Sequence, residues 1–229
     1  MEQILKIAGR HQIHVVEDAA QAIGATRQGQ RAGSFGIAAG FSLHPLKNLF
    51  VHGDGGVVTT NSDELAETVR QYRNHGLEGK NGASFWGRNS RLDEVQAAIG
   101  LVKLKHIDRW NERHREHASF YRYALNGAVH APSEEDNERP VYHRFMIRTS
   151  SRDALVEYLC KRGVETKINY PVPLHLNHPS RDLGYTQGCF VVCERLSNEI
   201  ISLPVYSHLK AEEIEYVVQQ VNLFFRDVK

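Results

Sequence analysis

The sequence has little cysteine, no long apolar run and almost no excess of charge. Three cysteines among 229 residues, none at the spacing of a metal knuckle, argue against a disulfide framework and indicate a reducing compartment. No apolar run reaches the ~20 residues that a membrane-spanning helix needs. The first residues, MEQILKIAGR, lack the apolar core of a signal peptide. We therefore expect a cytoplasmic protein without a membrane segment.

The positive and negative charges nearly cancel, with 28 lysines and arginines against 27 aspartates and glutamates. Proteins that bind nucleic acid usually carry a basic patch or stripe, so this balance argues against a nucleic-acid partner and favours a small polar ligand. The hydrophobic share of 41% is enough for one substantial core, or for a larger and a smaller lobe.

The order of apolar patterns predicts an α/β fold. A helix is expected over residues 2–10, and a buried β-branched strand then ends at Glu17 and Asp18. Two further short strands are expected within 33–43 and 55–61, with Asn61 and Ser62 as caps of a helix that follows. Strands separated by helices indicate an open, mostly parallel sheet.

The second half of the chain predicts a smaller α+β lobe. One long amphipathic pattern, over about 92–125, is longer than a usual globular helix and predicts a helix that bridges two lobes. A strand, a helix, a proline-rich stretch and a final helix follow, over 141–149, 151–163, 169–179 and 210–225. For the proline-rich stretch, a rigid linker and a substrate-lining loop remain open alternatives.

Three polar side chains lie where the first two strands are expected to end. Ligands of open α/β sheets bind beyond the carboxyl ends of the strands, which places Asp18 at a ligand crevice. The alternative is that Asp18 caps a helix over 19–25, because aspartate is a favoured N-cap. Lys47 follows the second strand, five residues after Ser42 and beyond Pro45. A solvated surface lysine is the ordinary alternative for Lys47.

These side chains match the needs of pyridoxal phosphate (PLP) in type. PLP requires a lysine for a Schiff base, an acidic partner for the pyridine nitrogen and donors for the phosphate. A partly desolvated lysine amine is able to attack the carbonyl that PLP supplies. His44, His52 and His175 lack helical i, i+4 spacing and a nearby acidic set, so no metal site is expected.

Seven segments resemble, in order and spacing, the DegT/StrS family of nucleotide-sugar aminotransferases, a branch of the aspartate-aminotransferase-like, fold-type I PLP enzymes. They are VVEDAAQAIGA, GSFG, FSLHPLKNL, GDGGVV, RNHGL, NSRLDEVQAA and NYPVPLHL, and together they cover essentially the whole chain. The resemblance implies an incomplete PLP-binding large domain with a mixed, mostly parallel sheet over 1–105. It implies a small α+β C-terminal domain over 106–229.

The resemblance also implies the roles of individual residues. Lys47 would form the Schiff base with PLP, and Asp18, Gln21 and Ser42 would reach the ring nitrogen, the ring hydroxyl and the phosphate. Asn89 would reach the same phosphate from the neighbouring subunit of a homodimer. Substrate contacts are expected from Arg91, Tyr170 and His175.

The implied reaction moves an amino group from an amino acid, with glutamate as the expected donor, to a keto nucleotide-sugar. It would serve polysaccharide or antibiotic-sugar biosynthesis. Dehydratase relatives carry histidine at the lysine position, so Lys47 favours transamination. Three residues depart from the family pattern: Leu46 replaces a small hydroxyl residue, Phe50 a glycine and Asn169 a histidine. Phe50 is expected to narrow the substrate mouth.

Family members usually begin with a further N-terminal part that supplies the first strands of the sheet, a phosphate-binding turn and an aromatic ring that stacks on PLP. This sequence starts at the strand that bears Asp18. Two alternatives are expected: a separately encoded N-terminal half associates with the chain, or the chain is a truncated, non-catalytic remnant or subunit.

Overall fold

A computed structural model describes residues 1–80, 82–125, 127 and 129–227. The chain forms two compact units: Met1–Glu112 with Glu134–His143, and Arg113–Ser133 with Arg144–Lys229. This division differs from the predicted one at residue 105 in two respects. It falls later in the chain, and a segment beyond the division returns to the first unit.

The first unit contains a mixed three-stranded sheet in the order β1 (Val16–Asp18), β4 (Ala38–Ser42) and β5 (Gly56–Thr60). Strands β1 and β4 are parallel, whereas β4 and β5 are antiparallel. The sheet is mixed, as the resemblance implies. Among the described residues, β1–β4 is its one parallel pair.

The expectation of a buried first strand is wrong. Val16 is 68% exposed, and β1 lies at the edge of the sheet with β4 as its one neighbour among the described strands. The core of this unit instead gathers around a cluster on the segment after β4 and on helix α4 (Ile107–Ala124), with partly buried side chains packed against it. The cluster comprises Leu43, Leu49, Val51 and Ile107, and its neighbours are Ile23, Leu92 and Trp110.

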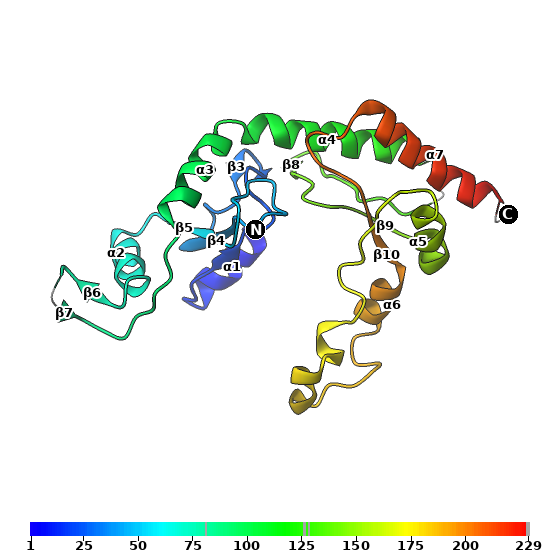
Figure 1. Ribbon diagram of the computed structural model, residues 1–229. Helices are drawn as coiled ribbons and strands as arrows, with labels where there is room; N and C mark the ends of the chain where they lie inside the picture. Colours follow the sequence, from blue (N-terminus) through cyan, green and yellow to red (C-terminus); the bar gives the residue numbers. More distant parts are fainter. Residues whose placement is uncertain (81, 126, 128, 228–229) are drawn as a thin grey trace. The chain divides into compact units, whose positions relative to one another are not determined.

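The helices α1 (Glu2–Arg10) and α2 (Asp63–Tyr72) form as predicted. The Ser62 hydroxyl caps α2 and accepts a hydrogen bond from the Leu65 amide at 3.2 Å. The single helix predicted over about 92–125 is wrong. It is two helices, α3 (Glu94–Leu104) and α4 (Ile107–Ala124), drawn in green in Figure 1.

The break between α3 and α4 has a tertiary cause. At the junction the His106 amide bonds to the Lys103 carbonyl, a three-residue step that tightens the last turn of α3. The next residue, Ile107, then enters the core and is 5% exposed. A continuous amphipathic pattern does not reveal such a change of direction.

No helix forms over residues 19–25, so Asp18 is not the N-cap of one. Tight turns replace it, with Ala22 and Ala25 amides bonded to the carbonyls three residues earlier. The chain then enters a small antiparallel sheet in the order β3, β2, β8, and a hairpin of β6 and β7 follows α2. Their bounds are β2 (Thr26–Arg27), β3 (Gln30–Arg31), β8 (Glu138–Arg139), β6 (Leu77–Glu78) and β7 (Gly82–Ala83).

The second unit pairs β9 (Phe145–Arg148) with β10 (Ile200–Leu203) in antiparallel register. The predicted strand, helix and final helix are confirmed as β9, α5 (Arg152–Cys160) and α7 (Ala211–Asp227). Four elements were not predicted: β10, helix α6 (Val191–Glu199) and the 3-10 helices η1 (Leu174–Leu176) and η2 (His178–Leu183).

The core of the second unit includes apolar side chains that are fully closed to solvent, among them Phe145, Ile147, Leu155, Leu159 and Ile201. The Tyr121 ring of α4 stacks on Phe145 at 4.9 Å between centroids. None of the described helices is both long and apolar enough to span a bilayer. The described residues also contain no cluster of three metal-ligating side chains.

Candidate active site

Asp18 and Ser42 lie on one face of the sheet. The register pairs Asp18 of β1 with Gly40 of β4, and Ser42 follows Gly40 by two residues. Paired residues share a face, and side chains two apart along a strand point the same way. A methyl group built on Gly40 would meet nothing within 4 Å. The face between the Asp18 carboxylate and the Ser42 hydroxyl is therefore open.

Glu17 points to the opposite face and has a different role. Its carboxylate accepts hydrogen bonds from the amides of Gly33, Phe35 and Gly36, at 2.8, 2.7 and 2.9 Å. These bonds fix the loop that contains the GSFG segment. The sequence analysis noted both carboxylates but assigned Glu17 no role. Strand alternation was the available signal that the two side chains diverge.

The Asp18 carboxylate is exposed, and its Oδ1 accepts from the Ala20 amide at 3.1 Å. Gln21 is also exposed and lies in the turn that follows. The turn thus carries a carboxylate and an amide side chain, both open to a ligand at the carboxyl end of β1.

Lys47 lies on a loop that is closed at both ends. The Leu43 amide bonds to the Gly55 carbonyl at 2.8 Å, and the Val51 amide bonds to the Leu43 carbonyl at 2.9 Å. Within the loop, the Lys47 amide bonds to the His44 carbonyl at 2.9 Å, and the His44 amide donates to the Ser42 hydroxyl at 3.3 Å. Lys47 is half-buried, and the two residues after it, Asn48 and Leu49, are buried.

Two contacts of this segment were not predicted. The Phe50 ring lies against helix α3, with the Lys103 Nζ 3.3 Å from the ring centroid. Burial lowers the pKa of Lys103. Gln96 of α3 holds the peptide of His52 from both sides: Oε1 accepts from the His52 amide at 2.8 Å, and Nε2 donates to the His52 carbonyl at 3.0 Å. The narrowing of a substrate mouth by Phe50 stays a prediction.

Asn89 and Arg91 lie together on the exposed segment before α3. The Arg91 Nε donates to Asn89 Oδ1 at 3.0 Å, and its Nη1 donates to Asn74 Oδ1 at 3.3 Å. Because the guanidinium occupies the amide oxygen of Asn89, the amide nitrogen is the group of Asn89 that remains for an anionic ligand.

Tyr170 belongs to the second unit and is 70% exposed. It lines a mostly apolar cavity of about 1060 Å³ whose other walls include Val172, Leu174 and Phe190. The preceding residue, Asn169, is held by its side-chain oxygen, which accepts a hydrogen bond from the Arg144 guanidinium. Asn169 thus anchors the proline-rich loop.

His175 is 8% exposed, and its Nε2 lies 2.9 Å from Glu194 Oε1. Glu194 also accepts from the amides of Gly188 and Phe190. Burial opposes ionisation of Glu194, but hydrogen bonds from His175 and these two amides lower its pKa overall. The pair therefore holds the loop between η1 and α6.

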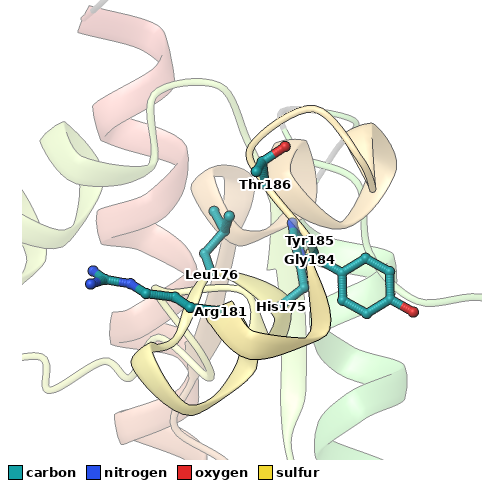
Figure 2. A pocket seen from close by; sticks show the side chains of 6 residues that line it. All are labelled: His175, Leu176, Arg181, Gly184, Tyr185 and Thr186. Carbon is teal, nitrogen blue, oxygen red and sulfur yellow. The ribbon is translucent and has the colours of Figure 1, made fainter.

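His175 also lines a second cavity, of about 360 Å³, with Leu176, Arg181, Gly184, Tyr185 and Thr186. Figure 2 shows the side chains of Arg181 and Tyr185 pointing to opposite sides, so their polar groups do not converge. The expected substrate contacts of Tyr170 and His175 stay predictions, and the two side chains line different cavities.

A family model now decides the classification. The model described as the DegT/DnrJ/EryC1/StrS aminotransferase family matches residues 1–222. The chain belongs to this family. The family membership agrees with the resemblance of the seven segments.

Individual relatives support the assignment. The chain is 45% identical to a pleiotropic regulatory protein of Geobacillus stearothermophilus, over 99% of this chain and 62% of the relative. It is 42% identical to a dTDP-3-amino-3,6-dideoxy-alpha-D-galactopyranose transaminase of Aneurinibacillus thermoaerophilus, over 98% of this chain and 61% of the relative. Among solved structures, S. venezuelae DesV in complex with a ketimine intermediate matches with a TM-score of 0.95 at 39% identity, over 98% of this chain and 61% of that one.

Proposed function

We propose that this DegT/DnrJ/EryC1/StrS family chain binds PLP and takes part in transferring an amino group from an amino acid, with glutamate as donor, to a keto nucleotide-sugar. The chain spans about 60% of the length of its curated relatives, so activity is proposed for the protein in its functional assembly. The observation that carries the proposal is the open sheet face between Asp18 and Ser42, with Lys47 on the closed loop that follows.

The residues present fit the cofactor. Bound PLP supplies an aldehyde for exchange with amines and a ring that takes up an electron pair. The Asp18 carboxylate would hold the proton on the ring nitrogen, Gln21 would donate to the ring hydroxyl and Ser42 to the phosphate. Lys47 would hold the cofactor through its amine, would be displaced by the donor amine, and would then move a proton between the nitrogen-bearing carbon of the substrate and the reactive carbon of the cofactor.

The remaining residues would complete the site. Asn89 would donate to the phosphate from the neighbouring subunit, in a homodimer or in association with an N-terminal half encoded separately. Arg91, Tyr170 and His175 would contact the substrate. Relatives named as nucleotide-sugar transaminases favour a cytoplasmic biosynthetic role, in polysaccharide or antibiotic-sugar formation.

A second candidate is a non-catalytic subunit or remnant that keeps the fold. Two observations favour it: β1 exposes an apolar edge at Val16, and the 45%-identical relative is named as a regulatory protein rather than a transaminase. On this reading the chain would keep its fold but would not hold PLP at Lys47.

Incubation with PLP separates the two candidates. The purified chain is mixed with PLP, reduced with borohydride and digested, and the modified lysine is identified by mass spectrometry. We expect modification at Lys47, its loss in Lys47→Arg, and unchanged modification in the control Lys6→Arg, an exposed residue of α1. Modification spread over surface lysines, with none specific to Lys47, would favour the second candidate.

A further inference from the structure

A buried pair of amide side chains links the loop of residues 43–51, which carries Lys47 and is called the lysine loop below, to the turn after Asp18. Asn48, the residue after Lys47, is 8% exposed, and Asn111 of α4 is 6% exposed. Asn48 Nδ2 donates to Asn111 Oδ1 at 2.8 Å. Asn111 Nδ2 donates to the Ile23 carbonyl at 2.9 Å. The chain of bonds therefore runs from the lysine loop, through α4, to the turn that begins at Asp18.

The pair uses the full capacity of the Asn48 amide nitrogen. Its second hydrogen goes to the Val141 carbonyl at 2.9 Å. An amide nitrogen has two hydrogens, so both are used, and neither aspartate nor an apolar side chain could replace them. Buried bonds of this kind are directional and fix one arrangement of the groups that they join.

The backbone makes room for this pair at one position. Gly24 has φ of +86°, and a methyl group there would meet Asn111 Nδ2 at 2.6 Å. A residue with a Cβ at position 24 would push Asn111 away from the Ile23 carbonyl. The turn after Asp18 is thus shaped around the Asn111 side chain.

We propose that Asn48 and Asn111 are positioning residues that set the Lys47 amine relative to the Asp18 carboxylate. Neither is among the residues proposed to contact the cofactor. They act through the loop of 43–51, which carries Lys47, and the turn of 18–25, which begins at Asp18. The amine and the carboxylate must both reach the pyridine ring of PLP. The expected effect on PLP capture rests on the proposed function. The hydrogen bonds that hold the lysine loop are present in the chain whether or not it binds PLP.

The test uses the leucine variants Asn48→Leu and Asn111→Leu, which keep the branched side chain but remove its hydrogen-bonding groups, and the control Asn222→Leu. Asn222 lies in the second unit, where its Nδ2 donates to the Ala124 carbonyl at 2.9 Å. The control therefore loses the same type of bond elsewhere. Asn111→Ser, which is smaller and polar, serves if a leucine variant does not fold.

Two rates are measured. The first is acetylation of Lys47 by a trace of acetic anhydride in the cofactor-free chain, relative to Lys6 in the same sample. The second is borohydride-trapped capture of PLP. Loosening the loop exposes the amine but loses its orientation, so acetylation is expected to rise and PLP capture to fall, each by about three- to tenfold, the worth of one hydrogen bond.

The two arms separate the outcomes. Opposite changes in Asn48→Leu and Asn111→Leu, with neither change in Asn222→Leu, support the positioning role. An acetylation ratio in both variants equal to that of Asn222→Leu overturns it. Failure of the unsubstituted chain to capture PLP would count against the proposed function alone, because acetylation is measured without cofactor.

Discussion

At the scale of the residue, two adjacent carboxylates of β1 have different roles because their side chains point to opposite faces of the sheet. Glu17 satisfies three backbone amides on one side of β1, whereas Asp18 stands exposed on the other side with one local bond. Sequence motifs can predict which residue types gather near a site. They do not show that Asp18, Gly40 and Ser42 share a face, because that depends on the register between strands that are far apart in sequence.

Substitution of Glu17 and of Asp18 should change the free energy of unfolding by different amounts. Glu17→Gln should lower the free energy of unfolding by roughly 1–3 kcal/mol, because an amide oxygen replaces a carboxylate that accepts several backbone bonds. Asp18→Asn changes an exposed group and should stay within about 0.5 kcal/mol. Urea unfolding of both variants measures this. PLP retention should fall in Asp18→Asn, and equal losses of stability in the two variants would contradict the assignment.

At the scale of the element, the features that depend on nearby residues were predicted from the sequence, whereas those that depend on tertiary packing were not. The cap at Ser62 and the strands on either side of the lysine loop are local, so the sequence contained enough to predict them. The break before Ile107 depends on burial of that residue in the core. Helix α6 escaped prediction because it begins with Val191 and Val192, β-branched residues that favour strands, after a proline-rich stretch.

Helix α4 carries a buried histidine that should make stability depend on pH. His117 is 5% exposed. Burial, together with the positive charges of Arg113 and His114, lowers its pKa below the ordinary 6.5, although Glu116 and the Tyr206 backbone oppose the shift. The unfolded state therefore binds the proton more readily, and stability should fall as pH drops below about 6.5.

The variant His117→Leu removes this titrating group. Its urea midpoint should decrease less between pH 7.5 and 5.0 than that of the unsubstituted chain, while the exposed-site control His178→Gln should follow the unsubstituted chain. Identical pH dependence in all three proteins would show that His117 does not contribute.

At the scale of the whole molecule, the edge strand β1 of the first unit exposes an apolar side chain. Strand β1 has one described neighbour, and its Val16 is 68% exposed. Unpaired strand edges with apolar side chains promote pairing with other chains. Either a partner segment covers this edge, or the isolated chain associates with itself.

Val16→Lys should reduce self-association of the isolated chain, because a lysine on an edge strand opposes pairing with a second edge. Light scattering over a range of protein concentrations measures the effect. The control Gln3→Lys adds the same charge on the exposed surface of α1 without removing an apolar side chain. Equal scattering by the two variants would assign the effect to net charge.

A crystal structure of the chain grown with PLP tests the central claim most directly, because it shows both ends of the cofactor ring. We expect Lys47 Nζ to be joined covalently to the cofactor, and an Asp18 carboxylate oxygen to lie within hydrogen-bonding distance of the pyridine nitrogen, about 2.7–2.9 Å. A cofactor attached to another lysine, or an Asp18 carboxylate turned away from the ring, would contradict the account.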